Sequence, residues 1–311
     1  MPQQRVASAS PRLEGHIRMM LSVNDTSLYV SRTSVASTGR MPALVLHGGL
    51  GWDHSYLTPW LDHFSDILDL VYYDHRGNGR SARPDDWSDV SHHTWVDDAE
   101  ALRVSLGFDR ALLFGHSYGS FLALEYAIRF PDRVAGLVLC STAPAIDYFE
   151  TAIANARRRA TDAQFMTLMK AMGDAPPTTD AELRAHTECV LPIYLHAPDD
   201  PLASTLLADV RYSRDAFVHA MANCLPRFDL RNRLHELRVP TLIVSGAEDW
   251  LTPPDLGGAR VSAAIPAATH LVFPRSGHFA FAEEPSAFQD ALRAWLVREK
   301  LVGAPNCATA A

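Results

Sequence analysis

A serine stands between two glycines at a spacing that suits nucleophilic attack. Residues 115–119 read GHSYG, follow the apolar run 111–114 and precede a helical pattern over 121–130. A tight turn between a strand and a helix lifts a serine hydroxyl out at the carboxyl end of a sheet. A side chain at either glycine would crowd the neighbouring strand and helix. We therefore interpret Ser117 as a nucleophile.

A serine hydroxyl becomes reactive only when a base removes its proton and a carboxylate orients that base. The candidate base is His278, which follows the last predicted strand and precedes the closing helical pattern. The candidate acid is Asp249, which follows the predicted strand 241–245. Glu248 and Asp255 are rival carboxylates, and the chain order serine, aspartate, histidine favours Asp249.

Attack on a carbonyl creates an oxyanion, which needs hydrogen-bond donors. Residues 47–51 read HGGLG and follow the apolar run 43–46. The glycines allow backbone amides to approach a substrate closely. We predict that the N–H groups of Gly49 and Tyr118 form the oxyanion hole, with Leu50 as an alternative to Gly49.

A second polar stretch, residues 74–81, reads DHRGNGRS and lacks the Lys-Ser/Thr ending of a phosphate-binding loop. We interpret it as structural. Asp74 and Arg76 are expected to tie adjacent loops together through charge-assisted hydrogen bonds.

The elements that must position these residues alternate between strand and helix patterns. A hairpin is predicted over 17–30, around Asn24 and Asp25. Short, wholly apolar runs are typical of parallel strands buried on both faces, and they occur at 43–46, 68–73, 111–114, 134–139, 241–245 and 270–273. Helical patterns occur at 94–106, 121–130 and 286–300. The alternation predicts an α/β fold with a doubly wound, mostly parallel sheet.

The pattern changes over residues 144–238, where helix starts replace buried-strand runs. Thr161 with Gln164 and Thr179 with Glu182 fit the capping box, and prolines at 176, 177 and 198 separate the helices. We predict a helical cap over 144–238, inserted into a core formed by 12–143 and 239–301. The segments 1–11 and 302–311 are expected to be flexible tails.

Composition excludes several classes of function. The net charge of −8 disfavours nucleic acid as a partner, and no apolar run approaches the roughly 20 residues that span a bilayer. Residues 1–18 lack the apolar core of a secretory signal. The four cysteines, Cys140, Cys189, Cys224 and Cys307, show no metal-ligand spacing. We expect reduced thiols and a cytoplasmic protein.

Together these motifs resemble the α/β-hydrolase superfamily from about Met41 to Arg298, apart from the variable cap. Residues 47–51, 74–81 and 115–130 look most like its proline-iminopeptidase-like branch. The resemblance implies a nucleophile, acid and base at Ser117, Asp249 and His278. It also implies a helical cap over the active site and no metal or organic cofactor.

The chain departs from that branch in ways that bear on its substrate. Leu50 stands where the aminopeptidases commonly have the proline of HGGPG, and no tryptophan lies between Trp95 and Trp250, where they often have a cap motif with two tryptophans and a glutamate. Acidic cap residues hold the substrate's free amine in that branch. The acidic cap residues here are Glu150, Glu182, Glu188, Asp199 and Asp200; none stands in a matching motif, and we interpret them as surface charges.

The leading hypothesis is a serine hydrolase that cleaves a small or medium, largely apolar ester, amide or lactone through an acyl-enzyme on Ser117. The alternatives are a proline-type aminopeptidase acting on a short peptide, a carbon–carbon bond hydrolase, and a non-catalytic ligand-binding homologue. The aromatic residues that flank the motifs are expected either to contact substrate or to pack in the core; these are Trp52, Tyr118, Trp250 and Phe279.

Overall fold

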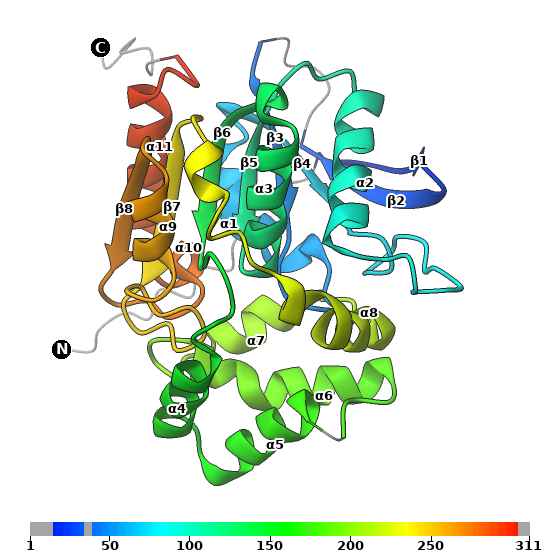
Figure 1. The fold of residues 1–311 in the computed structure, drawn as a ribbon, viewed down its shortest axis with the longest axis vertical. Coiled ribbons are helices and arrows are strands. Elements are labelled where there is room, and N and C mark those ends of the chain that lie inside the picture. Colours follow the sequence, from blue (N-terminus) through cyan, green and yellow to red (C-terminus); the bar gives the residue numbers. More distant parts are fainter. Residues whose placement is uncertain (1–14, 34–38, 174, 304–311) are drawn as a thin grey trace, which may run out of the picture.

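The computed structural model describes residues 15–33, 39–173 and 175–303, and these form a single eight-stranded sheet with helices around it (Figure 1). The strand order is β1-β2-β4-β3-β5-β6-β7-β8. The pairs from β4 to β8 are parallel, and the β1–β2 and β2–β4 pairs are antiparallel. The strands are β1 Ile17–Val23, β2 Thr26–Arg32, β3 Met41–Leu46, β4 Leu68–Tyr73, β5 Ala111–His116, β6 Val134–Cys140, β7 Thr241–Gly246 and β8 Ala268–Phe273.

Each predicted strand run lies within one of these strands, which confirms the α/β fold. Every residue of β4, β5, β6 and β7 is buried, because helices cover both faces of the sheet. Successive side chains alternate between the two faces. Leu44 therefore packs in one hydrophobic cluster with α2 (His92–Ser105) and α3 (Tyr118–Arg129), and Val45 packs in the other with α11 (Pro285–Arg298).

The helices begin close to their predicted positions. The pattern expected from 94 begins at His92, because Ser91 accepts from the Thr94 N–H and closes a capping box two residues earlier. The pattern expected from 121 begins at Tyr118, immediately after the turn. The remaining core helices are α1 Thr58–Leu61, α9 Gly258–Ala264 and α10 Ala280–Glu283.

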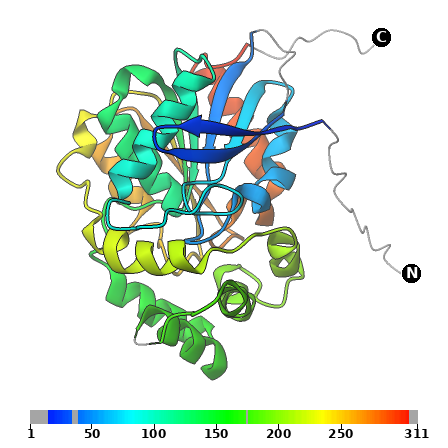
Figure 2. The same ribbon diagram turned by 90° about the vertical axis from the view of Figure 1, so that its right-hand side faces the viewer.

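A group of helices between β6 and β7 lies below the lower end of the sheet in Figure 1, at the carboxyl ends of the parallel strands. These helices are α4 Phe149–Arg159, α5 Asp162–Met172, α6 Asp180–Val190, α7 Leu202–Leu207 and α8 Arg214–His219. A bridge between Ala145 and Asp229 joins the two ends of the insertion. The sheet and the inserted helices form two layers when seen from the side (Figure 2).

The two expected capping boxes differ in the structure. Thr161 and Gln164 form a reciprocal box at the start of α5. Thr179 accepts from the Glu182 N–H, but the Glu182 carboxylate reaches one residue further back and accepts from Thr178. The box predicted at Thr179 is therefore wrong in its second half, because the Thr178 N–H and hydroxyl both offer Glu182 a donor.

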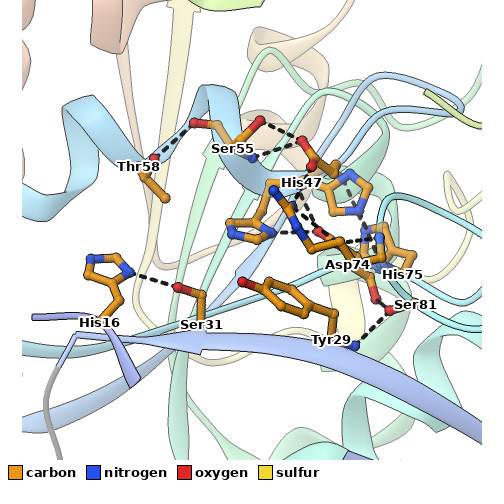
Figure 3. Close-up of polar contacts among 12 residues, drawn as sticks. His16, Tyr29, Ser31, His47, Ser55, Thr58, Asp74, His75 and Ser81 are labelled. Atoms are coloured by element: carbon orange, nitrogen blue, oxygen red, sulfur yellow. Dashed lines mark hydrogen bonds and ion pairs between the residues drawn. The ribbon is translucent and has the colours of Figure 1, made fainter. Parts of the chain in front are cut away.

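The loops after β3 and β4 are held by buried charges, as predicted for Asp74 and Arg76. Arg76 donates twice to Asp98 of α2, at 2.8 Å each, and at 2.6 Å to Asp25 in the hairpin turn. Asp74 accepts from His54 at 2.5 Å and from the Arg80 N–H at 2.8 Å; Figure 3 shows Asp74 among these polar contacts. These contacts hold the loop after β4 against α2, the hairpin turn and His54 of the loop after β3.

The described cysteines form no disulfide. Cys140, Cys189 and Cys224 are free thiols, and Cys307 lies outside the described residues. The expected tail 1–11 also lies outside them, as do residues 304–311. Within the described ranges, none of the helices has the length and apolar character needed to cross a membrane.

Buried neutral histidines predict an acid-labile fold. Burial lowers the pKa of His92 to about 4 and that of His116 to about 3, and it also lowers the pKa of His47 and His75. In the unfolded chain these groups titrate near 6.5. Because the folded pKa values are depressed, stability is fully present above pH 6.5 and is lost as the pH falls towards the folded pKa. At pH 5 we expect a loss of about 2 kcal/mol for each of His92 and His116.

Urea unfolding at pH 7.5, 6 and 5 measures this loss. His92→Gln should flatten the pH dependence of the unfolding free energy, whereas the same change at the exposed His235 should leave it as it is. An unfolding free energy that stays constant from pH 7.5 to 5 contradicts the prediction.

Candidate active site

Ser117 occupies the turn between β5 and α3 in a conformation that side chains rarely adopt, with φ 53° and ψ −122°. Such a conformation costs on the order of 1–3 kcal/mol and persists only where the surroundings impose it. The flanking glycines allow the turn: a Cβ at Gly115 would meet the backbone of α3, and a Cβ at Gly119 would meet the Leu46 carbonyl of β3. The Ser117 N–H donates to the Cys140 carbonyl at 2.9 Å, which ties the turn to the end of β6.

His278 and Asp249 come together from the loops after β8 and β7. His278 Nδ1 lies 2.7 Å from Asp249 Oδ2, and both side chains are buried. Thr252 donates its N–H to Oδ1 and its hydroxyl to Oδ2 of the same carboxylate. Burial by itself would raise the pKa of Asp249, but the charge and hydrogen bond of His278, together with two hydrogen bonds from Thr252, lower it to about 2. Asp249 is therefore ionised and holds the Nδ1–H tautomer of His278.

The two rival carboxylates lie elsewhere. Glu248 pairs with Arg159 at 2.7 Å and with His196 at 3.1 Å, and its side chain is 41% exposed. Asp255 is exposed. Of the three carboxylates, Asp249, which the chain order favoured, is therefore the one that contacts His278.

The peptide between Gly48 and Gly49 is oriented by His47. The His75 N–H donates to His47 Nε2 at 3.1 Å; both residues are labelled in Figure 3. The His47 proton is therefore on Nδ1, which donates to the Gly48 carbonyl at 2.9 Å. In a trans peptide the N–H points opposite to the carbonyl. The Gly49 N–H therefore points away from the His47 ring. Tyr118 is the first residue of α3, where an N–H has no partner inside the helix.

Ser117 and His278 open into one cavity of about 160 Å³ between the sheet and the inserted helices. Its wall is mostly apolar. The inserted segment contributes Ile146, Tyr148, Phe149, Leu168, Met172, Leu183, His186, Thr187, Val190, Leu191, Tyr194, Phe217, Met221 and Leu225. The core contributes Gly49, Leu50, Trp52, His116, Ser117, Tyr118, Phe121, Trp250, Leu251, Thr252, His278 and Phe279. Among the described residues, none of those that line this cavity is an aspartate or glutamate.

Each aromatic residue singled out from the sequence lines this cavity, and each is also buried: Trp52, Tyr118, Trp250 and Phe279. Burial of the four side chains is confirmed, and their contact with a substrate stays a prediction. The five acidic cap residues that we interpreted as surface charges are exposed: Glu150, Glu182, Glu188, Asp199 and Asp200.

Sequence reasoning missed the residues that hold the backbone around His278. The His278 N–H donates to the Tyr194 carbonyl of the cap at 2.7 Å. The N–H groups of Gly277 and Phe279, on either side, both donate to Glu283 Oε2, at 2.9 and 3.1 Å. Glu283 lies five residues after His278, at the end of a short helix, and that proximity was the only sequence signal for it.

The fold and the candidate site together point to one class of protein, and a comparison with family models identifies it. A family model described as alpha/beta hydrolase fold matches residues 42–285, and the chain belongs to this family. It is therefore a hydrolase.

Its relatives narrow the position within the family. The proline iminopeptidase of Lactiplantibacillus plantarum is 30% identical over 290 residues, which cover 83% of this chain and 93% of the relative. A proline iminopeptidase-related protein from Thermus thermophilus superposes with a TM-score of 0.72 at 25% identity, covering 91% of this chain and 97% of that one. The chain therefore lies in the proline-iminopeptidase-like branch.

The fold is also shared with proteins that have other names. An enol-lactonase from Burkholderia xenovorans superposes with a TM-score of 0.68 at 23% identity, covering 90% of this chain and 100% of that chain. At this identity the likeness concerns the fold alone.

Proposed function

We propose that the protein is a serine hydrolase that cleaves a small or medium, largely apolar carboxylic ester, amide or lactone through an acyl-enzyme on Ser117. One observation carries the proposal. Ser117 and a His278 paired with the buried Asp249 line the same apolar cavity.

The geometry supports a sequence of steps for the reaction. Ser117 Oγ attacks the substrate carbonyl, and its proton passes to His278 Nε2, because Nδ1 is engaged by Asp249. The N–H groups of Gly49 and Tyr118 stabilise the oxyanion. His278 then gives the proton to the leaving group, which departs and leaves an ester on Ser117. Water activated by His278 hydrolyses that ester and frees the carboxylic acid.

The cavity wall supports an uncharged, apolar substrate. Apolar side chains from α5, α6 and the segment after α8 face Ser117 across the cavity. Burying apolar surface there is favourable by about 25 cal/mol per Å². A charged group would lose its hydration without gaining a partner of opposite charge among the described lining residues.

The second candidate is a proline-type aminopeptidase, which the names of the relatives favour. Such an enzyme must hold a substrate's free, protonated amine. The described residues that line the cavity offer no carboxylate for it. A substrate whose amine is blocked, or one without an amine, suits this wall better.

The two candidates differ in an assay of proline p-nitroanilide, its N-acetyl derivative and p-nitrophenyl butyrate. We expect turnover of p-nitrophenyl butyrate, and we expect a fluorophosphonate to inhibit it. The N-acetyl anilide should react at least as fast as proline p-nitroanilide with its free amine. A strong preference for the free amine would instead establish the aminopeptidase. Absence of turnover together with absence of fluorophosphonate labelling would contradict both candidates.

We also propose that the protein is cytoplasmic and acts on a small molecule. The free thiols Cys140, Cys189 and Cys224 support a reducing compartment. The net charge of −8 supports an uncharged substrate over nucleic acid.

A further inference from the structure

A buried chain of hydrogen bonds joins the oxyanion loop to the backbone of the base. The Gly48 N–H donates to Tyr56 Oη at 2.7 Å. The Tyr56 hydroxyl lies 2.8 Å from His116 Nδ1, and His116 Nε2 lies 2.9 Å from the His278 carbonyl. Tyr56 is 2% exposed and His116 is 1% exposed, so water does not compete for these bonds.

The groups at the two ends of this series of hydrogen bonds determine where each proton lies. A backbone N–H can only donate and a carbonyl can only accept. His116 Nε2 must therefore carry a proton for the His278 carbonyl, which leaves Nδ1 to accept from the Tyr56 hydroxyl. This requires a neutral His116, and burial, reinforced by the nearby His278, lowers the pKa of His116 to about 3.

Each member of the chain is directly linked to a reacting group. The Gly48 N–H lies one peptide before the Gly49 N–H, the predicted oxyanion donor. His116 precedes Ser117 in the chain, and His278 is the base. Gly48 also packs against the turn, since a Cβ added to it would lie 2.8 Å from Ser117 Cβ. A rotation of either the loop or the turn would therefore disturb both.

The His278 carbonyl accepts from a second donor, so the loss of one donor can disturb the alignment of the base without unfolding the loop. Ser141 lies at the end of β6 with φ 53° and donates its hydroxyl to this carbonyl at 3.0 Å. Loss of the His116 bond therefore leaves the carbonyl with one partner. The loop that carries the base should remain folded, because the N–H groups of Gly277, His278 and Phe279 keep their partners, but its carbonyl loses one of two donors.

We propose that Tyr56 and His116 are positioning residues. Their hydrogen bonds, from the Gly48 N–H through Tyr56 and His116 to the His278 carbonyl, form a relay that aligns the Gly49 oxyanion donor, the Ser117 turn and the His278 base. The proposal rests on the proposed serine hydrolase function. It predicts that a break at either residue lowers kcat. A break at Tyr56 should leave KM nearly unchanged, because Tyr56 is not among the described residues that line the cavity.

Tyr56→Phe removes one hydroxyl and keeps the ring. We expect kcat for p-nitrophenyl butyrate to fall about 10- to 100-fold, as a small misplacement of reacting groups does, with KM within about threefold. Tyr126→Phe is the matched control: Tyr126 is equally buried, and its hydroxyl donates to Glu100 on the side of α3 that faces α2. The control should keep its kcat even if it loses stability.

A double-mutant cycle separates a relay from two independent structural roles. If Tyr56 and His116 act as one unit, Tyr56→Phe combined with His116→Phe should lower kcat about as much as the more damaging single change. Losses that multiply, a Tyr56→Phe variant with full kcat, or an effect on KM alone would each overturn the proposal.

Nitrogen NMR of the unmodified protein tests the relay without any folding concern. We expect the His116 imidazole, assigned by its loss in His116→Gln, to be neutral with its proton on Nε2 from pH 8 to 5. A proton on Nδ1 would overturn the relay. Failure of the proposed function is distinct from this result, because it would show as absent ester turnover in the unmodified protein.

Discussion

Ser117→Ala is expected to lower ester turnover on the order of 10⁶-fold, as removal of the nucleophile does in other serine hydrolases. The substitution removes the hydroxyl that forms the acyl-enzyme, and neither the base nor the oxyanion hole can replace it. Alanine keeps a Cβ, so the φ of 53° at this turn remains equally strained and the fold should be retained. The measurement is kcat/KM for p-nitrophenyl butyrate, together with fluorophosphonate labelling followed by mass spectrometry.

Ser245→Ala is the matched control for this loss. Ser245 is buried in β7 and its hydroxyl bonds to His270, outside the cavity lining. The control should keep labelling and turnover. A Ser117→Ala protein that still turns over the ester at the unmodified rate would rule out Ser117 as the nucleophile.

Asp249→Asn is expected to lower kcat about 10⁴-fold. The N–H groups of Leu251 and Thr252 donate to Asp249 Oδ1, so an asparagine would keep its oxygen there and turn its NH₂ group towards His278. That group donates to Nδ1 and forces the His278 proton onto Nε2. The nitrogen that should accept the proton of Ser117 would then already carry one.

The neighbouring carboxylate offers a stringent control. Glu248→Gln removes a charge one residue away, where it pairs with Arg159 and His196 near the surface. We expect kcat to stay within about twofold, since an exposed pair of this kind contributes on the order of 1 kcal/mol or less to stability. Equal losses at positions 248 and 249 would contradict the assignment of Asp249.

The strand and helix order was predictable because it follows from local patterns. Wholly apolar runs mark strands covered on both faces, and every such run lies in the sheet. Boundaries differed by two or three residues where a cap or a turn decides them, as at Ser91 and Tyr118. The helices α4, α7 and α8 were not predicted individually; α4 and α7 lack a side-chain cap, and the Ser213 cap of α8 was missed.

The candidate site was predictable where its residues follow strands. Parallel strands present their carboxyl ends at one edge of the sheet, so residues directly after β3, β5, β7 and β8 must lie near one another. Ser117, His278 and Gly49 follow this rule, and they line one cavity. Their catalytic roles remain predictions.

The amino-acid sequence by itself determined the fold class, and it predicted the positions of a nucleophile, a base and an oxyanion loop, because each depends on a motif joined to a local strand or helix pattern. Tertiary structure decided that Asp249, which the chain order favoured, meets His278, because the side chain of the adjacent Glu248 pairs with Arg159 and His196 instead. It alone decided the chemistry of the cavity wall, which is assembled from helices without a shared motif. It also decided the contact of Tyr56 with His116, sixty residues apart, because hydrogen bonds across that distance leave no periodic signal in the chain.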